Sequence, residues 1–367
     1  MTSARVHKPD YVLLIITGIL LIIGMFMIAS ASPVMSSTRF DDAYLLLKNQ
    51  FMGLAVGFVA LLAGIRIRYT FWKKAAPVLL IASLFLMALV FVPGIGLELK
   101  GAARWIAIGS ISFQPAEIAK LAFIIYLAAW LEAKQKEIQG FTTGFLPFLV
   151  MLGIISILFI LQPDIGTLGV LAVTATLLYF SGGGKIMQIG ILLLMGLAAL
   201  AVLVVLQPYR MERIAVFLEP NADVQGSGYQ LRQSLIALGS GGVAGKGFGM
   251  SRQKFNYLPE ATGDSIFAVY GEEFGFIGSL ALISVFLAFA WRGIHIARHA
   301  PDLFGKHLAT GITLLIIIQA FINMAAISGL VPLTGLPLSF ISFGSSALVV
   351  NLAEVGILMN ISKYTRV

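Results

Sequence analysis

The chain has 367 residues, of which 59% are hydrophobic and 11% are charged, and its formal net charge is +8 at pH 7. Soluble domains carry about a quarter charged residues, so this composition excludes an ordinary soluble fold. The Lys and Arg residues lie in short clusters between apolar runs rather than on one face, and we therefore expect no nucleic acid as a partner.

Apolar runs long enough to cross a hydrocarbon core of about 30 Å recur along the chain. We predict an all-α, polytopic membrane protein that forms a single domain over 1–367. About ten transmembrane helices are expected, near 11–31, 49–65, 75–93, 115–131, 144–162, 165–181, 186–206, 266–290, 308–331 and 338–361. The first run exceeds the 7–15 apolar residues of a secretory signal, so we interpret it as a retained span.

The basic residues of the short loops predict the orientation in the membrane, because cytoplasmic loops are enriched in Lys and Arg. One set of loops, with both termini, carries most of them: Arg5, Lys8, Arg66, Arg68, Lys73, Lys74, Lys134, Lys136, Lys185, Arg292, Arg298, Lys306, Lys363 and Arg366. We therefore expect cytoplasmic termini and a large extracellular loop at about 207–265, between helices seven and eight.

Ionisable residues at the outer ends of several spans predict a shared polar pocket, because charges at membrane depth usually face a cavity or a partner. They are Glu117, Lys120, Asp164, Asp264, Glu272 and Glu273. A simpler interpretation makes Glu117 and Lys120, one helical turn apart, an internal ion pair. In the same interpretation, Asp164 caps the helix that follows it.

Arg104 stands beside Trp105 in the outer segment 94–114. The pair suits anchoring at the membrane interface, where Trp is enriched and Arg extends its charge to the headgroups. The same guanidinium would also suit a phosphate ligand.

A glycine-rich stretch at 239–249 contains Lys246 but does not match a nucleotide-binding loop, because Gly247 follows the lysine where that motif has Ser or Thr. We interpret it as a re-entrant loop beside the polar pocket. The chain has no cysteine, which excludes thiolate metal sites, and its four histidines form no HExxH motif. A metal site built from these residues is not expected.

Long motifs along most of the chain resemble the SEDS family (shape, elongation, division and sporulation). They are GAARWI at 101–106, QPAEIAKL at 114–121, QPDIGT at 162–167, PYRMERI at 208–214, the stretch 239–278 and the stretch 329–362. Within it, SRQKFNYLPEA resembles the division branch, FtsW, more than the elongation branch, RodA.

The resemblance implies a peptidoglycan glycosyltransferase of the bacterial cytoplasmic (inner) membrane. Its substrate would be lipid II, the undecaprenyl-pyrophosphate-linked disaccharide peptide. Its partners would be a class B penicillin-binding protein (an FtsI-like transpeptidase) and other divisome membrane proteins. The family's essential aspartate maps onto Asp264, although Thr262, Gly263 and Ser265 depart from the family's HTDF pattern, and Gly344-Ser345 replaces Gly-Gly.

The chemistry of this transfer assigns roles to the candidate residues. Asp264 is the candidate general base for the attacking sugar hydroxyl, and a direct attack would invert the anomeric centre. The leaving pyrophosphate needs cations. The candidate substrate-binding residues are Arg104, Lys120, Arg210 and Arg213, with Glu117 and Asp164 to orient them. A divalent cation, Mg²⁺ or Mn²⁺, would serve the same purpose.

Three alternatives stay open from the sequence. The protein could be a lipid II flippase, which also suits ionisable groups in a bundle of spans, although no inverted repeat is evident. It could instead be the elongation, RodA-type polymerase, or a scaffold without enzymatic activity.

Overall fold

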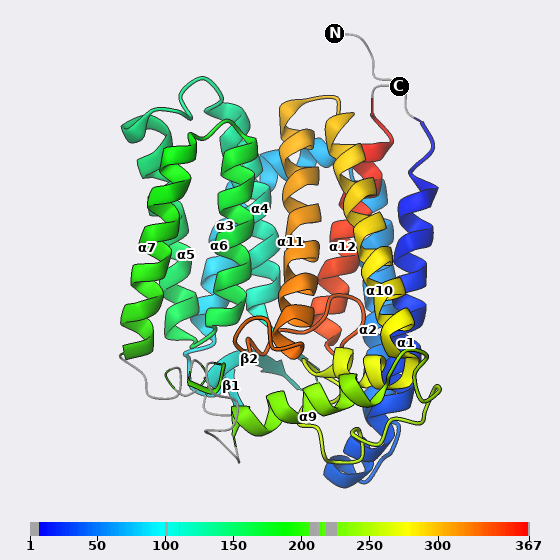
Figure 1. Cartoon of the computed structure of the whole chain (residues 1–367). Coiled ribbons are helices and arrows are strands. Elements are labelled where there is room, and N and C mark those ends of the chain that lie inside the picture. Colours follow the sequence, from blue (N-terminus) through cyan, green and yellow to red (C-terminus); the bar gives the residue numbers. More distant parts are fainter. Residues whose placement is uncertain are drawn as a thin grey trace.

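The computed structural model describes residues 7–99, 102–109, 111–205, 211, 213, 215–217 and 226–365. The helices stand side by side as one bundle, with both ends of the chain at the same end of it (Figure 1). The elements are α1 (Tyr11–Phe40), α2 (Leu45–Arg66), α3 (Tyr69–Leu89), β1 (Gly96–Leu99), β2 (Ala102–Ile108), β3 (Ile111–Phe113), α4 (Pro115–Ala133), the π-helix η1 (Phe141–Phe145), α5 (Leu146–Leu161), α6 (Ile165–Ser181), α7 (Ile186–Val205), α9 (Ser227–Ser240), α10 (Ile266–Arg298), α11 (Leu303–Ile327) and α12 (Ser345–Ser362).

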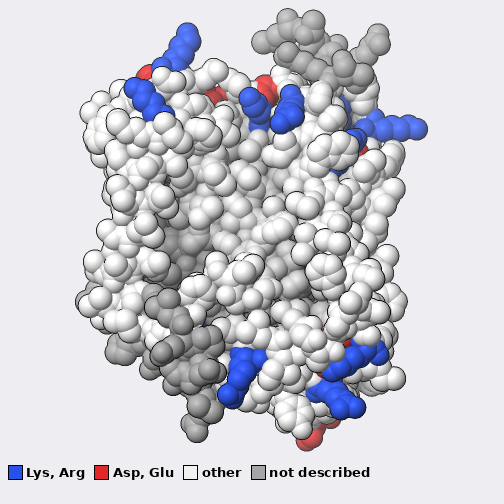
Figure 2. Space-filling view, in the orientation of Figure 1, with Lys and Arg blue, Asp and Glu red and all other residues white. Residues whose placement is uncertain are grey.

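The all-α, membrane-spanning class is confirmed. Eight helices within the described ranges are long and apolar enough to cross a membrane, and α6 is a shorter apolar helix of 17 residues. A further helix, α4, is not among the eight and carries Glu117, Lys120 and Glu132 in its 19 residues. Each expected span coincides with a helix, but the exact number of ten stays a prediction. Lys and Arg gather at the two ends of the face seen in Figure 2, as the bilayer requires.

Several helix ends differ from the expected ones: α3 begins at Tyr69 rather than near 75, and α10 continues to Arg298 rather than ending near 290. Helix α1 continues to Phe40 and stops only where Asp41 adopts a left-handed conformation. Helix α12 begins at Ser345 rather than near 338. The preceding segment is not helical because it contains two prolines and has positive φ at Gly329, Gly335 and Phe340.

Two regions expected as loops contain regular structure. The segment after α3 forms a three-stranded antiparallel meander in the order β1-β2-β3, with an irregular register between Leu97 and Glu98. The long segment before α10 contains α9. The sheet and α9 lie together at the end of the bundle away from the chain termini (Figure 1).

Small residues bring α2 and α12 into close contact. The backbone of Gly64 lies against that of Gly356, and Gly53 lies against Ser345. Such contacts are common between membrane helices. In lipid the hydrophobic effect does not drive helices together, so they associate through close van der Waals packing of their backbones. They fix α12 beside α2 and thereby fix the segment that precedes α12.

Helix α10 is broken at Gly275, where φ is 67° and ψ is −163°. The glycine-rich loop fills the break. The N–H groups of Phe276 and Ile277 donate to the carbonyls of Gly242 and Val243, at 2.9 and 3.1 Å. In return, the carbonyls of Glu272 and Glu273 accept from the N–H groups of Lys246 and Gly247, at 3.0 and 2.9 Å. The stretch 239–278 is therefore one folded unit.

Candidate functional site

A connecting segment, residues 328–344, joins α11 to α12 and lies at the end of the bundle that carries α9 (Figure 1). Its carbonyls accept from two amide side chains of α11: Asn323 Nδ2 donates to Leu336 at 2.6 Å, and Gln319 Nε2 donates to Pro337 at 3.1 Å. The N–H of Gly344 donates to Gln50 of α2 at 3.2 Å. Hydrogen bonds to side chains of two helices, α11 and α2, therefore hold this irregular backbone in place.

Asp264 lies against the connecting segment, immediately before α10. Its main-chain carbonyl accepts from Asn323 Nδ2 at 2.8 Å. Its carboxylate accepts from Gln230 of α9 at 3.3 Å, and Gln230 also donates to Ser265 Oγ at 2.9 Å. The side chain is half-buried. The acid is thus fixed by its backbone and is half-buried as a residue, with its Oδ1 atom buried.

Arg213 approaches the same point from the long segment before α9. Its Nη1 donates to the carbonyl of Leu333 at 2.8 Å. A Cβ atom built on Gly335 would lie 3.9 Å from Asp264 Oδ2 and 4.0 Å from Arg213 Nη1. Gly335 has φ of 70°, which favours glycine. The structure therefore brings a carboxylate and a guanidinium to one glycine, whereas Arg210 lies outside the described residues.

Glu117 and Lys120 form the ion pair expected from their spacing, with 2.9 Å between Glu117 Oε2 and Lys120 Nζ. They are buried, at 3% and 2% exposure. Lys120 Nζ also donates to Gln319 Oε1 at 2.6 Å. Gln319 in turn donates to Pro337 of the connecting segment, which links the pair to that segment. Asn323, one turn further along α11, donates separately to Leu336 and to the main-chain carbonyl of Asp264.

Asp164 caps α6, as expected, by accepting from the N–H of Thr167 at 3.3 Å. Its other oxygen accepts from Gln114 Nε2 at 3.3 Å. Arg104 of β2 donates from Nε to the carbonyl of Gln162 at 3.0 Å and from Nη2 to that of Pro163. Arg104 and Asp164 thus meet at the α5–α6 turn, where the guanidinium binds backbone.

Glu272 and Glu273 belong to a second, separate group. Glu272 accepts from Lys246 Nζ at 2.6 Å, Ser251 Oγ at 2.5 Å and the N–H of Arg252 at 3.2 Å. Glu273 pairs with Lys254 at 2.9 Å and accepts from Ser30 of α1 at 2.6 Å. These acids hold the glycine-rich loop, so the ionisable residues expected in one pocket divide into two groups.

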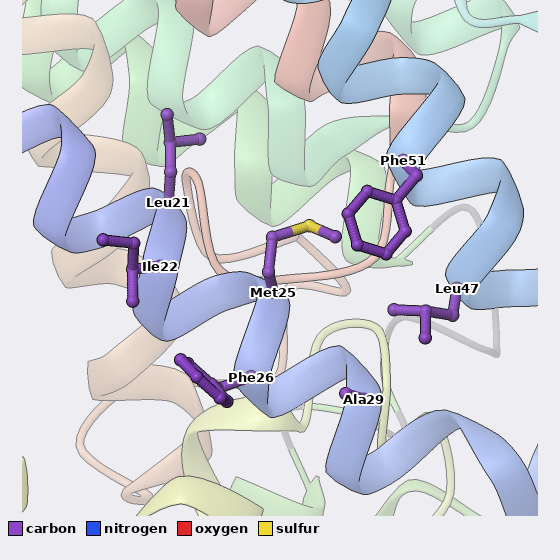
Figure 3. Close-up of a pocket in the computed structure, with 7 residues that line it drawn as sticks. All are labelled: Leu21, Ile22, Met25, Phe26, Ala29, Leu47 and Phe51. Atoms are coloured by element: carbon purple, nitrogen blue, oxygen red, sulfur yellow. The ribbon is translucent and has the colours of Figure 1, made fainter.

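Two hollows on the bundle surface are not lined by Asp264. One, of about 290 Å³, lies between α1 and α2 and is lined by Leu21, Ile22, Met25, Phe26, Ala29, Leu47 and Phe51 (Figure 3). Another, of about 360 Å³, lies between α9 and α10 and is lined largely by glycine and phenylalanine. The first is apolar and suits lipid chains rather than a charged sugar substrate.

Four residues that build the site were not predicted from the sequence: Gln230, Gln319, Asn323 and Gly335. A signal existed for two of them. Gln319 and Asn323 are amides one turn apart in an otherwise apolar run, and polar side chains in such runs usually bind another helix or irregular backbone. Gln230 and Gly335 have no comparable local signal, because their contacts to Asp264 come from segments distant in sequence.

The fold and the site together define an integral membrane protein with a carboxylate and a guanidinium at one end of a helical bundle. A family model described as "Cell cycle protein", for FtsW, RodA and SpoVE, matches residues 11–367. The chain is 42% identical to "Stage V sporulation protein E" of Bacillus subtilis (strain 168), over 100% of both chains. It is 41% identical to "Probable peptidoglycan glycosyltransferase FtsW" of Geobacter sp. (strain M18), over 99% of both.

Two solved structures share the fold. A chain from "Structural coordination of polymerization and crosslinking by a peptidoglycan synthase complex" has a TM-score of 0.79 and 26% identity, and the match covers 96% of this chain and 97% of that one. Rod shape determining protein RodA of Thermus thermophilus has a TM-score of 0.71 and 24% identity, over 96% of each chain. The chain therefore belongs to the FtsW/RodA/SpoVE family and is a multi-pass membrane protein, which confirms the resemblance found in the sequence.

Proposed function

We propose that this chain is a peptidoglycan glycosyltransferase that polymerises lipid II into glycan strands, for septal wall synthesis in cell division. The observation that carries the proposal is the meeting of Asp264 and Arg213 at Gly335. The names of the relatives support the reaction class and the division role, since the FtsW of Geobacter sp. carries the name of a peptidoglycan glycosyltransferase.

In the proposed reaction, a sugar hydroxyl of one lipid-linked chain attacks the anomeric carbon of another. A new C–O bond forms, the bond to the lipid pyrophosphate breaks, and the pyrophosphate leaves with the electron pair. Asp264 takes the hydroxyl proton as general base. A direct displacement of this kind inverts the anomeric centre. The half-buried carboxylate suits this role because its backbone is fixed by Asn323.

The negative charge that develops on the pyrophosphate requires cations beside Asp264. Arg213 is our first candidate because of its position at Gly335, and Arg210 is a second, outside the described residues. Arg104 and Lys120 stay predicted substrate-binding residues, but both are engaged in contacts within the protein. Arg104 is engaged with the α5–α6 turn, which Asp164 caps. Lys120 is buried with Glu117 beneath the connecting segment, so it would act by its field or after a local rearrangement.

A divalent cation fits this site only in company with the substrate. Among the described residues, no group of three or more His, Cys, Asp and Glu side chains could hold a metal ion. Mg²⁺ is commonly held by one or two carboxylates together with phosphate oxygens. Asp264 would hold Mg²⁺ or Mn²⁺ in this way, and the ion would neutralise charge on the pyrophosphate.

We place the site at the outer face of the membrane. Both chain ends lie at the end of the bundle opposite α9 (Figure 1), and the loops near them carry most of the basic residues. Because the chain has no cysteine, a single Tyr257→Cys in the exposed loop before Asp264 can be labelled alone. An impermeant maleimide should modify it from outside intact cells. Modification only from the cytoplasm would refute this orientation.

The expected partner is a class B penicillin-binding protein, an FtsI-like transpeptidase, among other divisome membrane proteins. The support is the fold match to a chain of a peptidoglycan synthase complex. Co-purification of the full chain with such a transpeptidase would test this part of the proposal.

The decisive assay supplies lipid II to the purified protein in detergent, with the transpeptidase present. The wild-type protein should form glycan chains, and Asp264→Asn should form almost none at equal expression and thermal stability. In detergent no membrane sidedness exists, so a flippase would give no polymer. No polymer under any condition, together with lipid II movement across vesicles, would replace our proposal with the flippase.

A further inference from the structure

The middle of α12 contains a buried acid that the proposed mechanism does not use. Glu354 is 1% exposed. Its Oε2 has no hydrogen-bond partner among the described residues. A carboxyl group inside a membrane bundle is costly unless it is paired or neutral. Its presence in this helix therefore requires a partner or a proton.

The orientation of α12 directs Glu354 away from α2. Leu352 and Gly356, one turn apart, lie against Gly57 and Gly64 of α2. Each residue of a helix is rotated by about 100° from the one before, so position 354 lies on the opposite face from both. Besides α2, helix α12 contacts α4 and α11, and to a smaller extent α1, α3 and α10. Asn351, one turn before Glu354, is also buried and its Nδ2 has no partner among the described residues.

Helices α4 and α12 are in contact, and their starts are in register because the N–H of Gln114, just before α4, donates to Ser346 Oγ of α12 at 3.2 Å. Lys120 and Glu354 follow these two residues by six and eight positions, so at 1.5 Å per residue they lie at similar depths, about 9 and 12 Å along their helices. Lys120 and Glu117 are therefore the charged groups of α4 nearest in depth to Glu354. An ammonium group has three N–H donors. Lys120 Nζ donates one of them to Gln319 Oε1 and forms an ion pair with Glu117 Oε2 at 2.9 Å. Among the described residues, Glu354 forms no ion pair with Lys120 in this arrangement, so its carboxyl is the second acid of the cluster rather than the present counter-ion.

The charges of this cluster do not balance if both acids are ionised, since one ammonium then faces two carboxylates in a medium that screens charge poorly. When two carboxylates share a site, one of them retains its proton. Glu117 is the acid in direct contact with Lys120, at 2.9 Å, and forms the ion pair. Glu354 is then the neutral one, which also explains how it is tolerated in an apolar helix.

We propose that Glu354 is a proton-carrying second acid of the Lys120 cluster, a positioning residue that becomes the counter-ion of Lys120 whenever Glu117 is neutralised or turns away. Lys120 then has one ionised acid as its partner, whether that acid is Glu117 or Glu354. Lys120 stays charged and held at Gln319, and through Gln319 the connecting segment stays in place. This inference rests on the proposed function only for its activity readout.

A double-mutant cycle tests the exchange of counter-ions. In Glu117→Gln, Glu354 should release its proton to solvent and pair with Lys120, so lipid II polymerisation should fall only a few-fold. Glu354→Gln alone should be near wild type because glutamine resembles the neutral acid. The variant with both changes leaves Lys120 without an acid. Its relative activity should be more than tenfold lower than the value obtained by multiplying the relative activities of the two single variants.

The matched control is Glu132→Gln, which removes an acid of α4 that pairs with Lys73 outside the cluster. When Glu132→Gln is combined with Glu117→Gln, the relative activity of the double variant should equal the product of the relative activities of the two single variants. Multiplicative effects for Glu117→Gln with Glu354→Gln as well would overturn the proposal. If the protein with both changes does not fold while each single variant does, that non-additive loss of stability supports it.

Infrared spectroscopy gives a readout that does not depend on activity. At neutral pH, the wild type should show the carbonyl band of a protonated carboxylic acid. The band should vanish in Glu354→Gln and in Glu117→Gln, and should remain in Glu132→Gln. A band that survives Glu354→Gln, or that is absent from the wild type, would overturn the proposal even if the protein polymerises lipid II. Conversely, the predicted bands in a protein without polymerase activity would leave Glu354 assigned and refute only the proposed function.

Discussion

Two acids near the start of α10 have opposite surroundings. Glu272 is 0% exposed and accepts hydrogen bonds from an ammonium, from two side-chain hydroxyls and from two main-chain N–H groups, all in the segment that precedes α10. Asp264 is half-buried, and its carboxylate shares its surroundings with Gln230, Gly335 and Arg213. A carboxylate whose oxygens accept many hydrogen bonds from the segment packed against it holds the fold. One that is positioned by its backbone and lies beside a guanidinium can serve chemistry.

The comparison predicts its largest effect at Asp264. Asp264→Asn should reduce lipid II polymerisation about a thousandfold, because general bases contribute about 10²- to 10⁴-fold. The thermal stability of the variant should stay close to that of the wild type. Glu98→Gln, which changes an exposed acid of β1 at the same end of the molecule, is the control and should keep full activity. A large loss of stability in Asp264→Asn would place this acid with Glu272 instead.

Glu272→Gln should have the converse phenotype. Neutralising an acid that is fully buried and paired should lower the free energy of unfolding by about 3 kcal/mol. Thermal unfolding in detergent measures this directly. Glu137→Gln removes an acid whose pair with Lys134 is solvent-exposed, and it should change stability by less than about 1 kcal/mol. Equal stability of the two variants would contradict a structural role for Glu272.

Two glycines of the loop sharpen the structural side of the comparison. Gly245 and Gly249 have similar φ values, 81° and 79°. A Cβ atom on Gly245 would collide with the backbone of Glu273, whereas one on Gly249 would meet no atom within 4 Å. Gly249→Ala should therefore cost only the strain of the left-handed conformation, about 1 kcal/mol. Gly245→Ala should cost about 2 kcal/mol more, as measured by thermal unfolding.

The smallest effect is expected at the cation beside Asp264. Arg213→Lys keeps the charge but loses the planar fork, so KM for lipid II should rise about tenfold with a smaller change in kcat. Arg252→Lys is the control, because the contact of Arg252 to Glu272 is made by its main-chain N–H. An unchanged KM in Arg213→Lys would remove Arg213 from the proposed pyrophosphate site.

The sequence was most informative where local chemistry decides the structure. The span at 165–181 is α6 to the residue, because Asp164 caps one end and Gly182 follows the other. The Glu117–Lys120 pair also follows from its spacing within one helix.

The features that were not predicted are those whose structure depends on contacts between segments distant in the sequence. The apolar residues before Ser345 resemble a span, yet they form the connecting segment because Gln50, Gln319 and Asn323 satisfy their backbone groups. In α9, residues 227–240 have a mixed pattern that no local signal separates from a loop. The placement of Gln230 and Gly335 beside Asp264 likewise depends on contacts between segments far apart in the chain.

The break at Gly275 has a consequence for motion. The glycine-rich loop supplies hydrogen-bond partners for the N–H and carbonyl groups of α10 that the break leaves open. If the loop and the broken part of α10 separated, the backbone groups of both would lose their partners. The amides of Lys246, Gly247, Phe276 and Ile277 should therefore exchange with deuterium together, as one cooperative opening unit, although about thirty residues separate the two pairs.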